Sequence, residues 1–210
     1  MEQKIATFRA WISNQMSNYD ASHDIVHIDN VVSHCIKILM NVKKSEKDNF
    51  KNWENIYFAT ILTSLAHDVC DKKYVRNVKA KLSHLSITLY RLGISWDIVK
   101  MVTNVVPRIS FSKRLREGEP LDLTADELFI YRVVSDSDYL EAMGATGVVR
   151  TYMFQAVHGH TAKGAWTHTT QNLFQCYNYL FFDYSLKEGK IRLERMKRIC
   201  EELNAERDFM

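Results

Sequence analysis

A short stretch in the first half of the chain has the composition of a metal and phosphate site. An apolar run is followed at once by His67 and Asp68, and then by Asp71 and two lysines. Imidazoles and carboxylates bind divalent metal ions, and ammonium groups bind phosphate. Neighbouring side chains on a helix point about 100° apart, but at a helix end both can reach one ion. Further ligands must come from elsewhere in the chain.

Two other polar residues with apolar neighbours could supply these ligands. His27 lies in the first turns of one predicted helix, and Asp138 lies late on another. An unpaired polar group at such a place would raise the free energy of the fold. Asp136 competes with Asp138 for the same role. Two imidazoles and two carboxylates suit one divalent ion (Mn²⁺, Fe²⁺, Co²⁺, Ni²⁺ or Zn²⁺, with Mg²⁺ as a further option) and leave positions open for water and a phosphate oxygen.

The spacing of apolar residues predicts an all-α protein. Apolar residues recur at helical spacing and no convincing strand alternation is present, while the seven glycines and two prolines lie mostly where the periodicity lapses. We expect helices at about residues 5–12, 25–39, 53–67, 82–92, 95–106, 124–138 and 148–157, and then two final helices separated at residues 187–189.

Caps and loops follow from the residues between these helices. Ser22 is expected to cap the second helix, and Thr124 with Glu127 has the spacing of a capping box. Gly144 and Gly147 should flank a short break. The charged run 43–47 and the polar stretch 108–123 are expected to be loops.

The length and charge of the chain indicate one domain that is not a dedicated nucleic-acid binder. The 210 residues can build one good core, and the even spread of apolar residues leads us to treat 1–210 as a single domain. The 28 basic and 25 acidic residues leave a net charge of +3, which could still suit a small anionic substrate.

The spacing of the cysteines and the composition of the first residues indicate where in the cell the protein is found. The four cysteines are far apart and show no C-x-x-C spacing, which favours a reducing, intracellular setting. The first residues carry charges and no apolar signal region, and no window approaches 18 apolar residues. We therefore expect a soluble, cytoplasmic protein that does not bind membranes.

Four motifs, read in order, resemble the HD-domain metal-dependent phosphohydrolases. They are SHDIVH at residues 22–27, LAHD at 65–68, ISFSK at 109–113 and DSDYLEAMGATGVVR at 136–150. The last two together resemble a subgroup of small single-domain proteins with nucleoside-triphosphate pyrophosphohydrolase members. The resemblance spans about residues 20–153 and implies an HD-domain helical bundle, on which C-terminal helices at about 166–207 would pack.

The donor set and the resemblance together give four metal ligands. These are His27, His67, Asp68 and Asp138. We prefer Asp138 to Asp136 because the Asp-x-Leu pattern of the resemblance falls on it. The binuclear HD phosphodiesterases need further histidines before the last aspartate, and only His84 lies there, so a mononuclear site is favoured.

The resemblance also implies roles in catalysis for the residues that follow Asp68. It places an acidic residue at Asp71, which would orient the attacking water or protonate the leaving group, with Lys72 beside it. The alternative interpretation makes Asp71 a helix-end charge paired with Lys72 or Lys73.

Substrate phosphates could be held by three cations. These are Lys72, Lys113 and Arg150, of which Arg150 offers bidentate geometry. The alternative for each is an ordinary surface or ion-pair residue. We also place His23 among the substrate-binding residues. It and Asp24 could instead orient the His27 imidazole or cap the helix.

The resemblance implies a metal-dependent phosphohydrolase acting on a nucleotide or related phosphate ester, including conversion of a nucleoside triphosphate to monophosphate and pyrophosphate. Tyr139 and Tyr179 stand where the subgroup has arginine and lysine, which leaves substrate preference open. One alternative is a catalytically inactive regulatory domain that binds metal or nucleotide. A weaker one is an HD-fold oxygenase. His34 and His84 are interpreted as ordinary helix residues.

Overall fold

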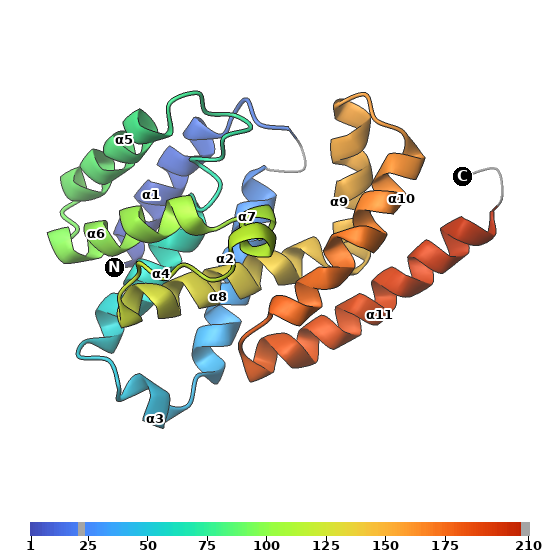
Figure 1. Ribbon diagram of the computed structural model, residues 1–210. Coiled ribbons are helices and arrows are strands. Elements are labelled where there is room, and N and C mark those ends of the chain that lie inside the picture. Colours follow the sequence, from blue (N-terminus) through green and yellow to red (C-terminus); the bar gives the residue numbers. More distant parts are fainter. Residues whose placement is uncertain (21–23, 207–210) are drawn as a thin grey trace.

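The computed structural model describes residues 1–20 and 24–206, and it contains helices and turns with no strand in these ranges (Figure 1). The predicted all-α class is confirmed. The helices are α1 (Glu2–Gln15), α2 (Ile25–Asn41), α3 (Lys44–Lys47), α4 (Trp53–Ala66), α5 (Val78–Arg91), α6 (Trp96–Val105), η1 (Val106–Arg108), α7 (Phe111–Glu117), α8 (Ala125–Ala142), α9 (Gly144–Val157), α10 (Ala162–Gln171), η2 (Leu173–Tyr179) and α11 (Asp183–Ala205), where η marks a 3₁₀ helix.

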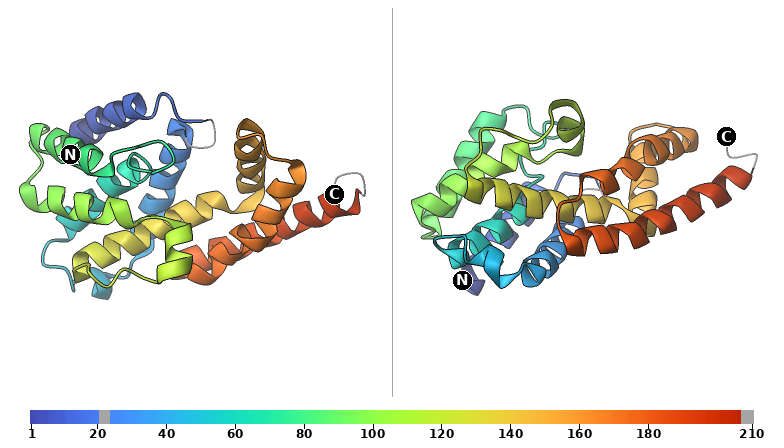
Figure 2. Two further views of the ribbon diagram at one scale, coloured as in Figure 1. Left: turned by 45° about the horizontal axis from the view of Figure 1, so that its top comes forward. Right: turned by 60° about the horizontal axis from the view of Figure 1, so that its bottom comes forward.

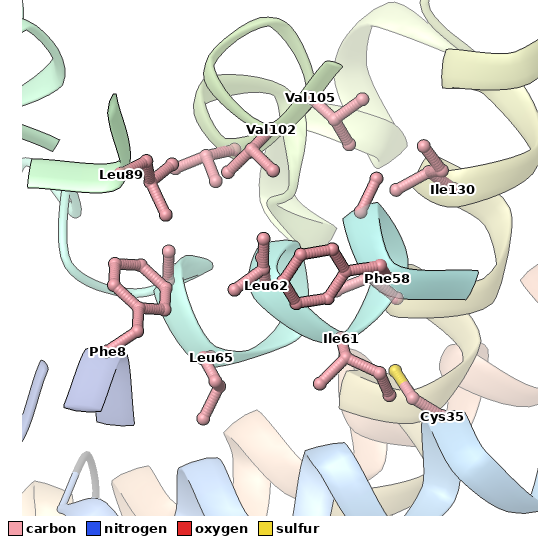
Figure 3. Close-up of a cluster of buried hydrophobic side chains, with 14 of the residues drawn as sticks. Phe8, Cys35, Phe58, Ile61, Leu62, Leu65, Leu89, Val102, Val105 and Ile130 are labelled. Carbon is pink, nitrogen blue, oxygen red and sulfur yellow. The ribbon is translucent and has the colours of Figure 1, made fainter. Parts of the chain in front are cut away.

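Helix α4 lies at the centre of the larger apolar cluster, to which α1, α2, α5, α6 and α8 also contribute. Every residue from Phe58 to Ala66 is buried, because apolar or small side chains occupy all sides of this part of the helix. Figure 3 shows its side chains facing Phe8 of α1, Leu89 of α5, Val102 of α6 and Ile130 of α8. The C-terminal end of α4 therefore lies inside the fold; His67, which follows it, is buried, and Asp68 is partly exposed.

Helix α8 contributes to two separate apolar clusters. Its first half, including Ile130 and Val134, belongs to the cluster around α4. Leu140, near its end, packs in a second cluster with Val148 of α9 and Met196 of α11. Both views of Figure 2 show α9, α10 and α11 at one end of α8 and α5 and α6 at the other. The organisation of residues 1–210 as one domain stays a prediction.

Two segments expected to be loops contain short helices. The run 43–47 includes α3, whose four residues have no buried member. The stretch 108–123 includes α7, which begins where the Ser110 side chain accepts a hydrogen bond from the backbone N–H of Lys113, and ends at Gly118 with φ of +77°. The capping box of Thr124 and Glu127 is confirmed at the start of α8.

Two glycine-based predictions are wrong, because these glycines serve close packing. Helix α11 is continuous through Gly189, where a Cβ atom would lie 2.4 Å from Leu180 Cδ1. Helix α9 begins at Gly144, and Gly147 lies within it, where a Cβ atom would lie 2.0 Å from the backbone oxygen of Ala142. A missing side chain at these two positions lets helix and neighbouring chain approach each other.

The four cysteines are all buried and are free thiols. Burial raises the pKa of Cys35 to about 12 and that of Cys70 to about 11. Cys35 and Cys70 lie in the cluster around α4, and Cys176 lies in the second cluster. None of the helices in the described part of the chain combines the length and the apolar character needed to cross a bilayer.

Candidate metal centre

His27 lies in the first turn of α2, and its backbone is fixed there by Asp24. The Asp24 side chain caps the helix by accepting a hydrogen bond of 3.0 Å from the backbone N–H of His27. Capping is thus one role that the structure shows for Asp24. Ser22, which we expected to cap this helix, and His23, which we placed with the substrate-binding residues, lie outside the described residues. The His27 imidazole is buried.

His67 and Asp68 follow directly after the buried end of α4. His67 is the C-cap residue of the helix. Its Nδ1 lies 2.8 Å from the carbonyl oxygen of Ser64, and because a carbonyl only accepts, Nδ1 carries the proton. The lone pair of the imidazole is therefore on Nε2, which is the nitrogen that faces the carboxylates of Asp68 and Asp138.

The four predicted ligands come together from α2, the end of α4 and α8. His27 Nε2 lies 3.3 Å from Asp68 Oδ2 and 3.6 Å from Asp138 Oδ1. His67 Nε2 lies 3.4 Å and 3.8 Å from the same two oxygens. Atoms that bind one ion at about 2.1 Å lie about 3 to 3.5 Å apart, which is close to these separations.

The donor atoms themselves fit a divalent ion. His67 Nε2 is buried and, in the part of the chain that the structure describes, has no hydrogen-bond partner. A buried polar atom of this kind normally has a partner, so its position indicates a ligand. Potential donor atoms of His27, His67 and Asp68 all lie within 4.8 Å of one another. The Asp68 and Asp138 side chains are 16% and 25% exposed, so water and substrate can reach the centre.

Opposing influences act on the pKa of His67. Burial is the largest and lowers it, but the negative charges of Asp68 and Asp138 raise it, and the net direction is upward. The positive charge of Arg150 acts in the opposite direction to these carboxylates. Two carboxylates thus create a negative potential at buried imidazoles, which is the field that favours a bound cation.

Asp136 and Asp138 face different parts of the molecule, since residues two apart on a helix point about 200° from each other. Asp136 accepts hydrogen bonds of 3.0 and 3.1 Å from the backbone N–H groups of Phe181 and Phe182, just before α11. Asp138 faces His27 and His67. The geometry supports the preference for Asp138 as a ligand and gives Asp136 a structural role.

Asp71 lies one turn beyond Asp68 and contacts Lys73. Asp71 Oδ1 accepts a hydrogen bond of 2.8 Å from the backbone N–H of Lys73, and Oδ2 lies 3.8 Å from the Lys73 ammonium. Lys72 is exposed. The ion pair that we considered as the alternative role of Asp71 is therefore present, with Lys73 as the partner. A catalytic role for Asp71 and Lys72 stays a prediction.

The other two predicted phosphate-binding cations, Lys113 and Arg150, have different surroundings. The Lys113 ammonium lies 3.9 Å from Glu117 and lines a cavity of about 390 Å³ with Arg108 and Arg114. Arg150 lies on α9, and its Nη1 is 3.7 Å from Glu141 Oε1. Arg150 is the one whose charge acts on His67.

Sequence reasoning missed a polar group next to the metal centre. Glu141 is buried on α8 and accepts a hydrogen bond of 3.0 Å from Asn30 Nδ2 of α2. His34, interpreted as an ordinary helix residue, is buried with its Nε2 3.8 Å from Glu141 Oε2. Asn30 and Glu141 each stand three residues after a predicted ligand, and this spacing was the available signal.

Comparisons with known proteins identify similar chains. The uncharacterized protein YpgQ of Bacillus subtilis is 26% identical over 157 residues, which cover 74% of this chain and 68% of that protein. No protein-family model matches the chain. The crystal structure of Bacillus subtilis YpgQ in complex with ADP superposes with a TM-score of 0.72 at 23% identity, over 96% of each chain.

A second solved structure shows the fold. An HD-superfamily hydrolase from Bacillus thuringiensis matches with a TM-score of 0.69 at 19% identity, over 100% of this chain and 99% of that one. The resemblance to HD-domain proteins that the motifs indicated is confirmed at the level of the fold.

Proposed function

Because the chain has the fold of the HD-superfamily hydrolases, we propose that it is a metal-dependent phosphohydrolase acting on a nucleotide or a related phosphate ester. The observation that carries this proposal is the buried Nε2 of His67, which has no hydrogen-bond partner within the described ranges and faces Asp68 and Asp138 beside His27. The ADP complex of the related YpgQ supports a nucleotide as the ligand class.

The ion would be held by His27, His67, Asp68 and Asp138. A divalent ion bound there would polarise a phosphoryl oxygen and acidify a water molecule. The Ser64 carbonyl fixes the His67 tautomer, so that Nε2 is available without a proton rearrangement. The partly exposed carboxylates form the side of the centre that substrate can approach.

Two groups beside the ligands would act on the substrate. Asp71 would orient the attacking water through its carboxylate, which the backbone N–H of Lys73 holds in place. Arg150 would bind a phosphoryl oxygen, since a guanidinium presents donors in a planar fork. Hydrolysis of a nucleoside triphosphate to monophosphate and pyrophosphate is one form of the reaction that the resemblance includes, and Tyr139 and Tyr179 leave the substrate preference open.

The competing proposal is a regulatory domain that binds metal or nucleotide without turnover. The observation in its favour is the contact of Asp71 with Lys73, which gives this carboxylate a role without chemistry. It predicts a bound metal ion and no product.

A substrate screen separates the two proposals. The purified protein is incubated with Mn²⁺, Co²⁺ or Mg²⁺ and nucleoside mono-, di- and triphosphates, and phosphate and pyrophosphate are detected separately. We expect metal-dependent release of one of these products, and Asp68→Ala should abolish it. Metal binding by elemental analysis with no release from any nucleotide would favour the regulatory domain.

A further inference from the structure

A buried carboxylate with three polar neighbours lies next to the proposed metal centre. Glu141 is 4% exposed. Its Oε1 accepts a hydrogen bond of 3.0 Å from Asn30 Nδ2 and lies 3.7 Å from Arg150 Nη1, and its Oε2 lies 3.8 Å from His34 Nε2. The group joins α2, α8 and α9, and none of the roles proposed above uses Glu141.

The spacing along two helices places this group one turn from the metal ligands. Asn30 follows His27 by three residues on α2, and Glu141 follows Asp138 by three residues on α8. One helical turn rises about 5 Å, which is within reach of a substrate held at the metal centre. The action of the Arg150 charge on His67 agrees with this placement.

The polar neighbours of Glu141 offset the free-energy cost of burying its carboxylate. A buried carboxylate is strongly unfavourable unless it is paired and hydrogen-bonded, and Asn30 and Arg150 meet that requirement together. Pairing with Glu141 also restricts the Arg150 side chain, so less rotamer entropy is lost when its guanidinium binds an anion. A guanidinium has five N–H donors, more than one carboxylate can accept, so pairing with Glu141 is compatible with binding an anion.

We infer that Glu141 is a positioning residue, which holds the Arg150 guanidinium at the edge of the metal centre so that it binds a phosphoryl group of the substrate. The inference rests on the proposed function and adds a residue that acts through Arg150 without touching the substrate. A purely structural role would make the same group an ion pair that only holds α2, α8 and α9 together.

Binding of ADP tests the positioning role without requiring turnover. Titration calorimetry in Mn²⁺ buffer compares the wild type with Glu141→Gln, Arg150→Ala and the double variant. We expect each single substitution to raise the Kd for ADP about tenfold, near the contribution of one charge-assisted interaction. The double variant should bind no more weakly than Arg150→Ala, because Glu141 acts through Arg150. On a hydrolysed nucleotide, KM should rise about tenfold and kcat should change little.

The matched control is Glu127→Gln, which removes a second buried charge from the same helix. Glu127 is 6% exposed and, like Glu141, accepts a hydrogen bond from an asparagine side chain, Asn104, at 2.7 Å. Both glutamine variants should lower the melting temperature, but only Glu141→Gln should weaken ADP binding. If Glu141→Gln does not fold, Asn30→Ala, which removes the 3.0 Å support of Glu141, should weaken binding in the same direction.

Three results would overturn the inference. Wild-type affinity in the folded Glu141→Gln variant, or in Asn30→Ala where that variant replaces it, would leave Glu141 as a structural ion-pair residue. Independent losses that multiply in the double variant would show that Glu141 does not act through Arg150. A wild-type protein that neither binds ADP nor hydrolyses any nucleotide would overturn the proposed function itself, a failure that differs from the other two because it appears before any substitution.

Discussion

At the scale of single residues, Asp68 and Asp71 show how two neighbouring carboxylates have different surroundings. Asp68 Oδ2 lies within 3.4 Å of both imidazoles, whereas Asp71 contacts Lys73. Asp68→Ala should therefore lower metal content and activity together. Asp71→Ala should keep the metal and reduce turnover by about 10² to 10⁴, the usual effect of general acid–base catalysis.

Elemental analysis and kcat, measured on both variants, check this contrast. If Asp71→Ala turns over at close to the wild-type rate, the residue is only the ion-pair partner of Lys73. If it loses the metal, Asp71 belongs among the ligands.

The buried His34 side chain should make the free energy of unfolding depend on pH. Burial, supported by the charges of Arg192 and Lys37, lowers its pKa from 6.5 to about 4. The unfolded chain therefore binds a proton between about pH 6.5 and 4 that the folded protein does not bind, and stability falls as the pH falls through this interval. The loss amounts to about 3 kcal/mol at pH 4 relative to pH 7.

Denaturant unfolding at several pH values measures this effect. His34→Gln should be less stable at pH 7 and should show a flatter dependence between pH 4 and 7. An unchanged slope in the variant would assign the acid sensitivity to other groups.

The sequence indicated some of the residues that the structure brings together and not others, for a physical reason. The four predicted ligands are imidazoles and carboxylates at helix ends or among apolar residues, so their types and flanking motifs could be recognised in the chain. Glu141 was missed because its contacts are with Asn30 and Arg150, which lie on two other helices. Only the packing of α2, α8 and α9 brings these three together.

At the scale of elements, Gly189 makes the close contact of α11 with Leu180 possible. Alanine is the better helix former, yet its Cβ would lie 2.4 Å from Leu180 Cδ1 and 3.3 Å from Tyr177 Cδ2. Gly189→Ala should therefore destabilise the protein by about 1 to 3 kcal/mol, as overpacking does.

Gly164 is the matched position, because it lies in α10 with no atom closer than 3.6 Å to an added Cβ. Gly164→Ala should stabilise by about 0.5 to 1 kcal/mol. Urea unfolding of both variants measures the difference. An increase in stability for Gly189→Ala would show that Leu180 can move away without loss.

The sequence located the longer helices and missed the short ones. Apolar periodicity over many residues identified α1, α2, α4 and α8. It could not identify α3, which has four residues and no buried side chain, or the continuity of α11 through Gly189. The glycine signal is the same for a helix end and for a close contact, and only the position of Leu180 distinguishes the two.

At the scale of the whole molecule, the proposed metal centre connects helices that are distant in sequence. Its ligands belong to α2, to the end of α4 and to α8. An ion that binds only the folded state stabilises it by about 2.7 kcal/mol at a concentration one hundred times Kd. A chelator should therefore lower the melting temperature of the wild type and leave that of Asp68→Ala unchanged. Differential scanning calorimetry measures both, and equal shifts would place the stabilising ion elsewhere.

The reaction rates of the four buried cysteines with a thiol reagent can report local opening of the fold. A thiol reagent attacks the ionised sulfur, and burial both covers these groups and keeps them protonated. Each cysteine should therefore react only when the structure around it opens, and its reaction rate measures how often that happens. Cys70, two residues after Asp68, should react more slowly when Mn²⁺ is added, whereas the rate of Cys176 in the second cluster should change less. Mass spectrometry of the modified peptides over time would then show whether the cluster around α4 or the second cluster opens more often.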